Sequence, residues 1–311
     1  MDERIKNSFM IINKELLQKK FGKNLSFDEK LSKYNWFNLG GPADIFYRPE
    51  NESQLKEFLK EMNNSTSKVF ILGAGSNTLI RDSGIKGIVI KLGSKFSEIK
   101  KIDDETIEVG AAALDRKVSD FAKDNNIGNM EFLSCIPGSV GGAITMNSGC
   151  YGYDISQILK SVKVLDRLGN TKNINKEEIN FFYRGTNISS SLIILSAVLK
   201  GKVALKSKIE IKQREYIDKK KETQPSRVKT GGSTFKNNGE KKAWSLIKEA
   251  GCDKMQVGDA MISEKHCNFF INNGKAKSSD IETLIAKVKK QVLDKTGVKL
   301  DLEIKIIGNE K

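Results

Sequence analysis

The chain has 311 residues, of which 38% are hydrophobic, and its 53 basic and 39 acidic residues give a net charge of +14. This length allows about two domains of ordinary size with a sizeable core. The N-terminus lacks the unbroken apolar stretch of a signal peptide, and no apolar run approaches the length of a membrane span. We therefore expect a soluble, cytoplasmic, globular protein with no membrane partner.

The distribution of charge and the cysteine content reduce the number of possible functions further. The lysines are spread along the chain without a basic stripe of interleaved aromatic residues, so we interpret the charge as solvated surface and expect no nucleic-acid partner. One histidine and four cysteines without CxxC spacing exclude the usual zinc patterns, and we predict no metal site. Buried or unreactive thiols are expected at Cys135, Cys150, Cys252 and Cys267.

The first half of the chain alternates helical and strand patterns. Apolar residues at helical spacing predict a helix over 53–62, and the apolar run 68–72 predicts a strand that leads into GAGSN. Further strands are expected at 85–92 and 106–114, before a helix with apolar positions 114, 118, 121 and 122. The order of strand, helix, strand and loop is typical of an α/β region.

From about residue 160 the pattern changes to β and then to α+β. A hairpin is predicted over 161–174 and a buried strand over 192–201, and a charged helix ends before Pro225. In the last third we expect a helix closed by Gly251, a strand over 260–274 and a final strand over 300–308. A helix over 278–297 has Ser279 and Glu282 in capping-box spacing. We predict an α/β region to about residue 206 and a smaller α+β region after it.

Two glycine-rich loops indicate a ligand. GAGSN, Gly73 to Asn77, follows a strand, but the third glycine of a dinucleotide fingerprint would fall on Thr78, which excludes that motif. A tight turn remains, in which backbone N–H groups approach an anion and Ser76 and Asn77 add donors; a plain turn is the alternative. PGSVGGA, Pro137 to Ala143, is richer in glycine and marks backbone that lies close to a ligand. Together the loops favour a diphosphate.

The stretch GGSTFKN places Ser233 behind two glycines, and on its own it is typical of a polar turn. A reactive serine needs a group that handles its proton, usually a histidine. The single histidine, His266, lies in SEKHCNFFIN and is interpreted as a hydrogen-bonded structural residue. Any chemistry at Ser233 must therefore work without a Ser-His pair.

As a set, these stretches resemble the UDP-N-acetylenolpyruvoylglucosamine reductases, the MurB family of bacterial cell-wall synthesis. The matching stretches are NLGGPAD, GAGSN, IPGSVGGAITMNSG with YG, YRGTN, GGSTFKN and LEIKIIG, from about residue 35 to residue 308. The short distance from YG to YR is similar to that of the smaller subgroup without an inserted tyrosine loop. The oligomeric state is not predicted.

The resemblance implies an FAD-binding fold of the vanillyl-alcohol-oxidase type and a smaller C-terminal α+β substrate-binding domain. We expect the FAD-binding region at 1–206, with two α/β subdomains that meet near residue 100, and the substrate domain at 207–311; a return of the last strand to the FAD-binding region is left open. The resemblance implies non-covalent FAD held by Gly73, Ala74, Gly75, Ser76, Asn77, Pro137, Gly138, Ser139, Gly141, Gly142 and Asn147.

The implied reaction is the NADPH-driven reduction of UDP-N-acetylglucosamine enolpyruvate to UDP-N-acetylmuramate. Ser233 matches the family's proton donor, and Arg184 and Glu303 match the residues that stabilise charge on the substrate. Tyr183, Lys236 and Asn237 match substrate-binding positions. A carbanion is basic enough to take a serine proton, which would explain why no histidine is needed.

Without the resemblance, the sequence predicts that Arg184 is a surface charge before a turn. The alternation of apolar and charged residues around Glu303 then predicts an exposed strand face for this residue. Two functions from other classes stay open on the sequence alone. A flavin oxidase of the same fold would commonly tether FAD through a histidine near the first glycine loop, where this chain has none. A basic nucleic-acid-binding protein fits the net charge but leaves both glycine loops unexplained.

Overall fold

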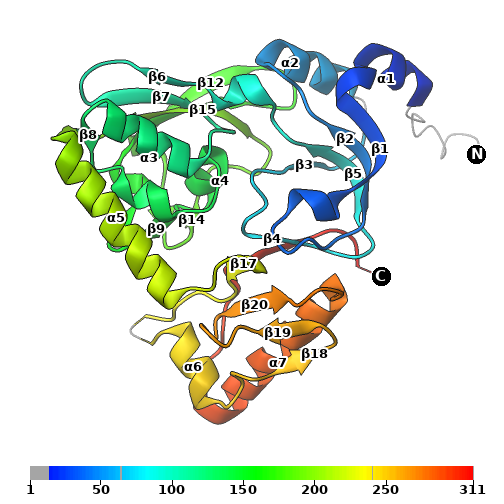
Figure 1. Cartoon of the computed structure of the whole chain (residues 1–311). Helices are drawn as coiled ribbons and strands as arrows, with labels where there is room; N and C mark the ends of the chain where they lie inside the picture. The colour runs from blue at the N-terminus through cyan, green and yellow to red at the C-terminus, as the bar shows by residue number, and fades with distance from the viewer. Residues whose placement is uncertain (1–13, 64, 240, 311) are drawn as a thin grey trace, which may run out of the picture.

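The structure, a computed structural model, describes residues 14–63, 65–239 and 241–310, which form three lobes (Figure 1). The N-terminal lobe contains a four-stranded sheet of order β1-β2-β5-β3, in which β2, β5 and β3 are parallel. Its strands and helices are β1 (Leu25–Lys30), β2 (Pro42–Tyr47), β3 (Val69–Ile71), β5 (Ile85–Ile90), α1 (Lys14–Phe21) and α2 (Glu52–Glu61). The parallel arrangement brings the carboxyl ends of β2, β5 and β3 to one edge of the sheet.

The predicted first helix is α2, and it begins slightly earlier than expected. Asn51 is its N-cap, because the Asn51 side chain accepts a hydrogen bond from the backbone N–H of Gln54 at 3.0 Å. The face with Leu55 and Phe58 is buried in the core of this lobe, as the helical spacing predicts.

The second lobe contains an antiparallel five-stranded sheet of order β12-β11-β15-β7-β6. The strands are β6 (Ile99–Lys101), β7 (Thr106–Gly110), β11 (Leu159–Leu165), β12 (Thr171–Asn175) and β15 (Ile193–Lys200). Its helices are α3 (Asp115–Asp124), α4 (Val140–Thr145) and α5 (Lys206–Thr223). The pairing of β11 with β12 confirms the predicted hairpin, and α5 ends before Pro225 as expected.

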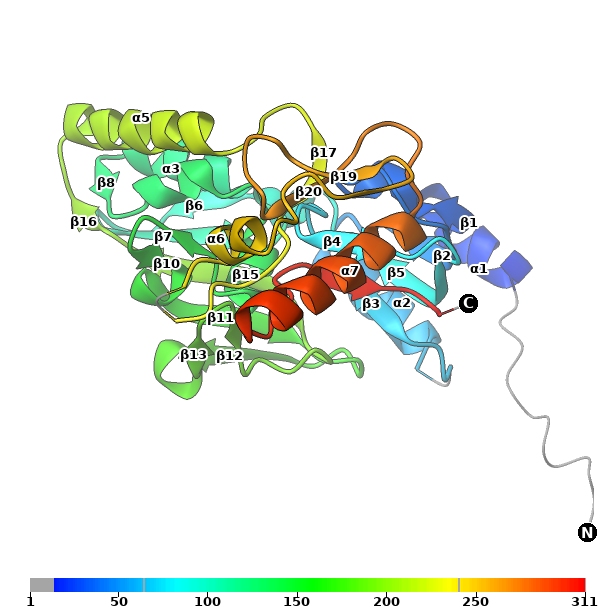
Figure 2. The same ribbon diagram turned by 90° about the horizontal axis from the view of Figure 1, so that it is seen from below.

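Short strands complete this lobe around its helices. They pair as β8 (Ile127–Gly128) with β16 (Lys202–Val203), β9 (Gly149–Cys150) with β10 (Tyr153–Asp154), and β13 (Phe181–Phe182) with β14 (Gly185–Thr186). The long helix α5 runs beside α3 (Figures 1 and 2), where Gln213 donates to the Ser119 hydroxyl at 2.7 Å.

The C-terminal lobe packs α6 (Ala243–Glu249) and α7 (Ser278–Thr296) against a sheet of order β17-β20-β19-β18. Its strands are β17 (Lys229–Ser233), β18 (Gln256–Val257), β19 (Ala260–Ile262) and β20 (Phe269–Asn272). The single strand predicted over 260–274 is wrong, because a turn at Ser263–His266 divides it into β19 and β20. His266 Nδ1 accepts the N–H of Asn268 at 3.2 Å, so this histidine is hydrogen-bonded as expected, and its structural role stays a prediction.

The end of the chain joins the N-terminal and C-terminal lobes. The strand β21 (Lys305–Ile307) pairs in parallel with β4 (Thr78–Ile80), and Leu302 forms an isolated bridge with Phe235. The predicted final strand is therefore shorter than expected, because its residues pair with two different lobes in succession. Figure 1 shows β4 and the C-terminal segment between the two lobes.

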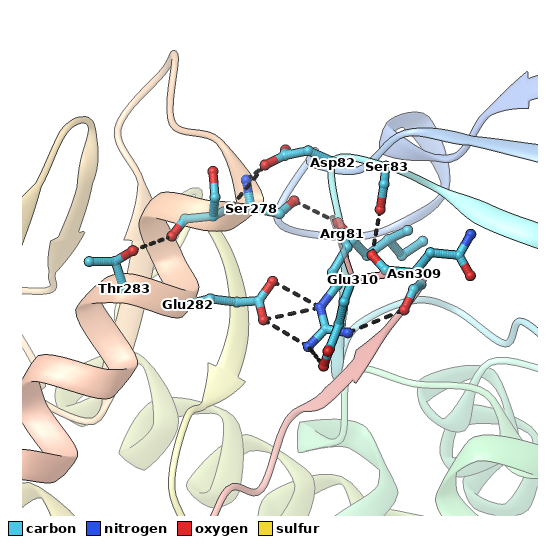
Figure 3. A network of polar contacts seen from close by, with 11 residues as sticks. Arg81, Asp82, Ser83, Ser278, Glu282, Thr283, Asn309 and Glu310 are labelled. Atoms are coloured by element: carbon cyan, nitrogen blue, oxygen red, sulfur yellow. Dashed lines mark hydrogen bonds and ion pairs between the residues drawn. The ribbon is translucent and has the colours of Figure 1, made fainter.

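Polar side chains fasten α7 to the far end of this strand pair (Figure 3). The Asp82 carboxylate accepts the N–H groups of Ser278 at 2.9 Å and Ser279 at 3.0 Å. The predicted capping box between Ser279 and Glu282 is wrong: Asp82, distant in sequence, caps the helix, and Glu282 accepts two hydrogen bonds from Arg81 Nε at 3.1 and 3.2 Å. We call Arg81, Asp82, Ser278, Glu282 and Glu310 the clamp.

No helix within the described ranges is long and apolar enough to cross a membrane. The cytoplasmic location stays a prediction. Within the same residues, no group of three or more histidine, cysteine or acidic side chains could hold a metal ion.

Candidate active site

A cavity of about 830 Å³ opens where the three lobes meet. Both glycine loops line it, together with residues from β17 and from the segment before β21. Thirteen of the residues proposed from sequence lie in its wall: Gly73, Ala74, Gly75, Ser76, Asn77, Pro137, Gly138, Ser139, Gly141, Gly142, Arg184, Ser233 and Glu303.

The first glycine loop leaves β3 at the carboxyl edge of the parallel strands. Gly75 has φ +70°, and a Cβ there would lie 2.2 Å from the Tyr34 carbonyl oxygen, so only glycine fits. Asn77 uses its side-chain amide within the protein, where Nδ2 donates to the Glu303 carbonyl at 3.0 Å. The loop is thus tied to the segment that carries Glu303.

The second glycine loop leads into α4 and leaves room for a ligand. A Cβ on Gly142 would meet nothing closer than the Ser139 hydroxyl at 3.8 Å, whereas one on Gly141 would lie 3.2 Å from the Ala111 Cβ. Because Gly142 lines the cavity, a side chain there would occupy ligand space. Gly141 instead allows close packing against Ala111.

Two buried polar groups of the cavity wall have no hydrogen-bond partner in the part of the chain that the structure describes. The Ser139 hydroxyl and both carboxylate oxygens of Asp115 are buried without a hydrogen bond among the described residues. Burial raises the pKa of Asp115 well above its ordinary range. Buried polar groups are almost always paired, so their presence between the loops fits a wall that a polar cofactor completes.

Sequence reasoning missed two cations at the same edge. Arg48 follows β2 and Lys91 follows β5, and both line the cavity. Lys91 Nζ donates to the Gly73 carbonyl at 2.6 Å, and neither cation forms an ion pair within the described part of the chain. Burial and then the charge of Arg48 lower the pKa of Lys91. A basic residue directly after an apolar run was the available signal, but only the parallel pairing brings the two together.

The glycines before Ser233 have distinct structural reasons. A Cβ on Gly231 would lie 2.4 Å from the Phe37 ring, and Gly232 has φ +77°. The register of β17 against β20 shifts between Thr230 and Ser233, so this irregularity re-aims the chain at the cavity. The half-buried Ser233 hydroxyl has no hydrogen-bond partner within the described residues.

Arg184 lies in the two-residue turn between β13 and β14 and has φ +60°, a conformation that costs a non-glycine residue about 1 kcal/mol or more. Its Nε donates to Glu303 Oε1 at 2.7 Å, and its Nη2 donates to the Gly149 carbonyl at 3.2 Å. Its guanidinium also lies over the Tyr183 ring, with 4.9 Å to the centroid. The strained turn thus holds the guanidinium at the cavity.

Glu303 combines burial with a cationic neighbourhood. Burial raises its pKa above the ordinary value, while Arg184 and, to a smaller extent, Lys236 act in the opposite direction. The side chains of Arg184 and Glu303 are only 22% and 16% exposed, so water screens them weakly. A carboxyl group in this setting holds a proton more readily than an exposed glutamate.

Four residues proposed from sequence do not line the cavity. Asn147 accepts the N–H of Ser156 at 3.0 Å and supports the wall, and Tyr183 is half-exposed beneath Arg184. Asn237 Oδ1 accepts the N–H of Ala243 at 3.0 Å, at the start of α6. The charge of Lys236 lies close enough to Glu303 to lower the pKa of that carboxyl group.

Two family models match the chain. The model of the UDP-N-acetylenolpyruvoylglucosamine reductase C-terminal domain matches residues 224–307, and that of an FAD binding domain matches residues 43–175. Together they cover both glycine loops, Ser233 and Glu303, whereas Arg184 lies between the two matched ranges.

Named relatives match nearly the whole chain. UDP-N-acetylenolpyruvoylglucosamine reductase of Pelagibacter ubique (strain HTCC1062) is 45% identical over 286 residues, which are 91% of this chain and 94% of the relative. The enzyme of Orientia tsutsugamushi (strain Boryong) is 42% identical over 284 residues, 90% of this chain and 93% of the relative. The crystal structure of UDP-N-acetylenolpyruvylglucosamine reductase (MurB) from Thermus caldophilus superposes with a TM-score of 0.78 at 31% identity, covering 91% of this chain and 97% of that one.

These matches confirm the predicted fold class, an FAD-binding fold with a smaller MurB-type C-terminal domain, and the predicted FAD cofactor. The chain belongs to the MurB family of UDP-N-acetylenolpyruvoylglucosamine reductases and is an FAD-dependent oxidoreductase of peptidoglycan synthesis.

Proposed function

We propose that this enzyme uses NADPH to reduce UDP-N-acetylglucosamine enolpyruvate to UDP-N-acetylmuramate. The observation that carries the proposal is the contact of Arg184 with Glu303 in one cavity with the Ser233 hydroxyl, which has no hydrogen-bond partner among the described residues. Residues 184 and 303 are far apart in sequence, and a strained turn holds the arginine there. Such an arrangement suits a carboxylate-bearing substrate whose charge grows during the reaction.

We infer that the two glycine loops hold FAD through backbone N–H groups, with the hydroxyls of Ser76 and Ser139 as side-chain partners. Arg48 and Lys91, which lack ion-pair partners among the described residues, would balance the charge of its diphosphate. Gly142 leaves the space that the cofactor requires. When bound, FAD supplies the hydride for the reduction.

Arg184 and Glu303 would act on the enolpyruvyl carboxylate. The guanidinium offers fixed, permanently charged donors, which stabilise negative charge as the carboxylate becomes enolate-like. Glu303, whose pKa is raised by burial, can share a proton with that group. Because Gly149 and Glu303 already orient the guanidinium, little rearrangement is needed when charge develops.

Ser233 would supply the proton that completes the reduction. Its hydroxyl has no internal partner within the described residues, so it is free to contact the substrate. A carbanion is a strong enough base to take this proton, which removes the need for a histidine; His266 is engaged in its own turn. Lys236, whose charge reaches Glu303, would lower the cost of the transient alkoxide.

We also infer which part of the chain binds FAD and which part binds the substrate. Residues 1–206 would form the FAD-binding region, with a subdivision near residue 100, and residues 207–311 the substrate domain, apart from β21, which pairs with β4.

Half-reactions of Ser233→Ala test the proposal. Reduction of the flavin by NADPH should stay nearly normal, while oxidation of the pre-reduced enzyme by UDP-N-acetylglucosamine enolpyruvate slows by roughly 10²-fold to 10⁴-fold, the range of general-acid catalysis. Ser245→Ala is the matched control, because the exposed Ser245 hydroxyl donates only to the Lys242 carbonyl. Near-normal oxidation of the Ser233 variant would remove this residue from the mechanism.

A further inference from the structure

An exposed tryptophan lies beside the first glycine loop, and the reaction proposed above does not use it. Among the large apolar residues that are exposed, three line the cavity: Trp36, Ile71 and Leu114. Trp36 is the aromatic member of the three and is 46% exposed. Single exposed apolar residues are common on protein surfaces, so a role for Trp36 depends on how the chain holds it in the cavity wall.

The backbone of Trp36 is attached to the first glycine loop. Its N–H group donates to the Gly75 carbonyl at 3.0 Å. The approach is close, because a Cβ on Gly75 would lie 2.2 Å from the Tyr34 carbonyl oxygen and 2.7 Å from the Asn35 Cα. Gly75 therefore allows the segment that carries Trp36 to lie directly against the loop.

The two neighbours of Trp36 are buried and hold the segment in place. The Asn35 side-chain amide donates to the Leu39 carbonyl at 2.7 Å. The Phe37 side chain is fully buried, and the Phe37 carbonyl accepts a hydrogen bond from the Asn272 side-chain amide of the C-terminal lobe at 2.9 Å. The segment is thus fixed to two lobes, while Trp36 between these neighbours stays exposed.

A rigidly held aromatic residue in a cavity wall suits a flat ring. Because the backbone is already ordered, two side-chain torsions are left to fix on binding, which keeps the entropic cost low. FAD has two planar heterocyclic rings, adenine and isoalloxazine, and either can stack on an aromatic side chain. We propose that the indole of Trp36 stacks on a planar ring of bound FAD. This inference rests on the proposed placement of FAD along the first glycine loop.

Titration of apoprotein with FAD tests this role without turnover, NADPH or the UDP-sugar. Trp36→Ala should raise the Kd for FAD by roughly fivefold to 150-fold, the range for loss of one stacked ring. Trp36→Phe keeps an aromatic face and should recover most of the affinity, whereas Trp36→Leu keeps only apolar contact and should stay close to the alanine variant. Trp244→Ala is the matched control, because Trp244 is 44% exposed on α6 and does not line the cavity.

Two fragments of the cofactor distinguish its rings. ADP carries only the adenine, and FMN carries only the isoalloxazine. Loss of affinity for ADP alone in Trp36→Ala would assign the stack to adenine, and loss of affinity for FMN alone would assign it to isoalloxazine. An equal loss for both fragments, which a distortion of the whole site would produce, would overturn the proposal.

A wild-type Kd for FAD in Trp36→Ala would also overturn the proposal. So would a leucine variant that binds FAD as tightly as the phenylalanine variant, because apolar cover would then account for the affinity. Gly142→Val in the same titration separates this inference from the placement of the cofactor. If Gly142→Val weakens FAD binding and Trp36→Ala does not, FAD still occupies the loops and only the stacking is rejected.

Discussion

The two ends of the β4–β21 pair carry polar side chains that differ in what they bind. At the far end, the clamp residues satisfy one another: Arg81 contacts Glu282 and Glu310, and Asp82 caps α7 (Figure 3). At the near end, Asn77 and Glu303 border a cavity in which the Ser139 hydroxyl and the Asp115 carboxylate have no hydrogen-bond partner, and Arg48 and Lys91 form no ion pair, among the described residues.

This difference separates stability from function along one structural element. Polar groups taken from water require partners, which the clamp supplies from the chain and the cavity wall must obtain from a ligand. Substitutions in the wall should therefore alter binding or turnover and leave folding largely intact. Substitutions in the clamp should lower the free energy of unfolding and leave the chemistry intact.

Among the substitutions that compare the two ends of the β4–β21 pair, the largest effect is expected at the Arg184–Glu303 pair. Glu303→Gln keeps size and a donor but cannot return a proton, and Arg184→Lys keeps charge but loses the forked donor geometry. We expect each to slow oxidation of the pre-reduced enzyme by the enolpyruvyl substrate by roughly 10²-fold to 10³-fold. Binding of that substrate to oxidised enzyme should weaken much less. Normal oxidation rates with altered affinity alone would reduce both residues to binding groups.

A smaller effect, on FAD binding alone, is expected from substitution of Gly142. Valine there would enter ligand space, and the cost of about 1–3 kcal/mol corresponds to a Kd for FAD raised by roughly fivefold to 150-fold. Titration of apoprotein with FAD measures this change, with Gly142→Ala as the smaller member of the series. The thermal unfolding temperature of the apoprotein should not fall, because replacement of a glycine within α4 favours the helix. Full FAD affinity in the valine variant would contradict the assignment of the loop.

The difference between contacts within a local segment and contacts between distant segments explains how much of the fold the sequence could predict. Periodicity identified α2, the β11–β12 hairpin and α5, because each depends on neighbours in the chain. It missed the Asp82 cap on α7, since the partner lies almost two hundred residues away. The turn that separates β19 from β20 was also missed, because it lies within an apolar run.

The site shows the same limit. Gly75 and Gly232 could be identified from the sequence because the positive φ angle that favours glycine at each position is a property of the local turn. The juxtaposition of Arg184 with Glu303 came from the family resemblance, and alternation alone would have placed Glu303 on an exposed face. Arg48 and Lys91 come together only through the parallel order of β2 and β5, which no local pattern encodes.

In the clamp, Arg81→Met should lower the free energy of unfolding of the apoprotein by about 1–2 kcal/mol. The guanidinium donates to Glu282 through Nε and Nη2 in a partly buried setting, so it contributes more than an exposed ion pair. A double-mutant cycle with Glu282→Gln in urea isolates the pair. FAD affinity should stay unchanged. A loss of FAD affinity without loss of stability would break the proposed separation of the two ends.

The smallest and most specific effect concerns the charge of Asp82. Burial alone would raise its pKa, but the N–H groups of Ser279 and Ser278 bind the carboxylate, and the net result is a pKa below the ordinary value of 3.8. Because the folded protein holds the proton more weakly than the unfolded chain, this stabilisation is fully present above the unfolded pKa and is lost as the pH falls through the folded one. Asp82→Asn should therefore cost about 1 kcal/mol near neutral pH, in the range of a helix cap, and the difference from wild type should shrink below about pH 4. Urea unfolding of the apoprotein across this range measures it, with the exposed Glu264→Gln as control. An unchanged difference at acid pH would mean that the shape of Asp82, and not its charge, holds α7 to the N-terminal lobe.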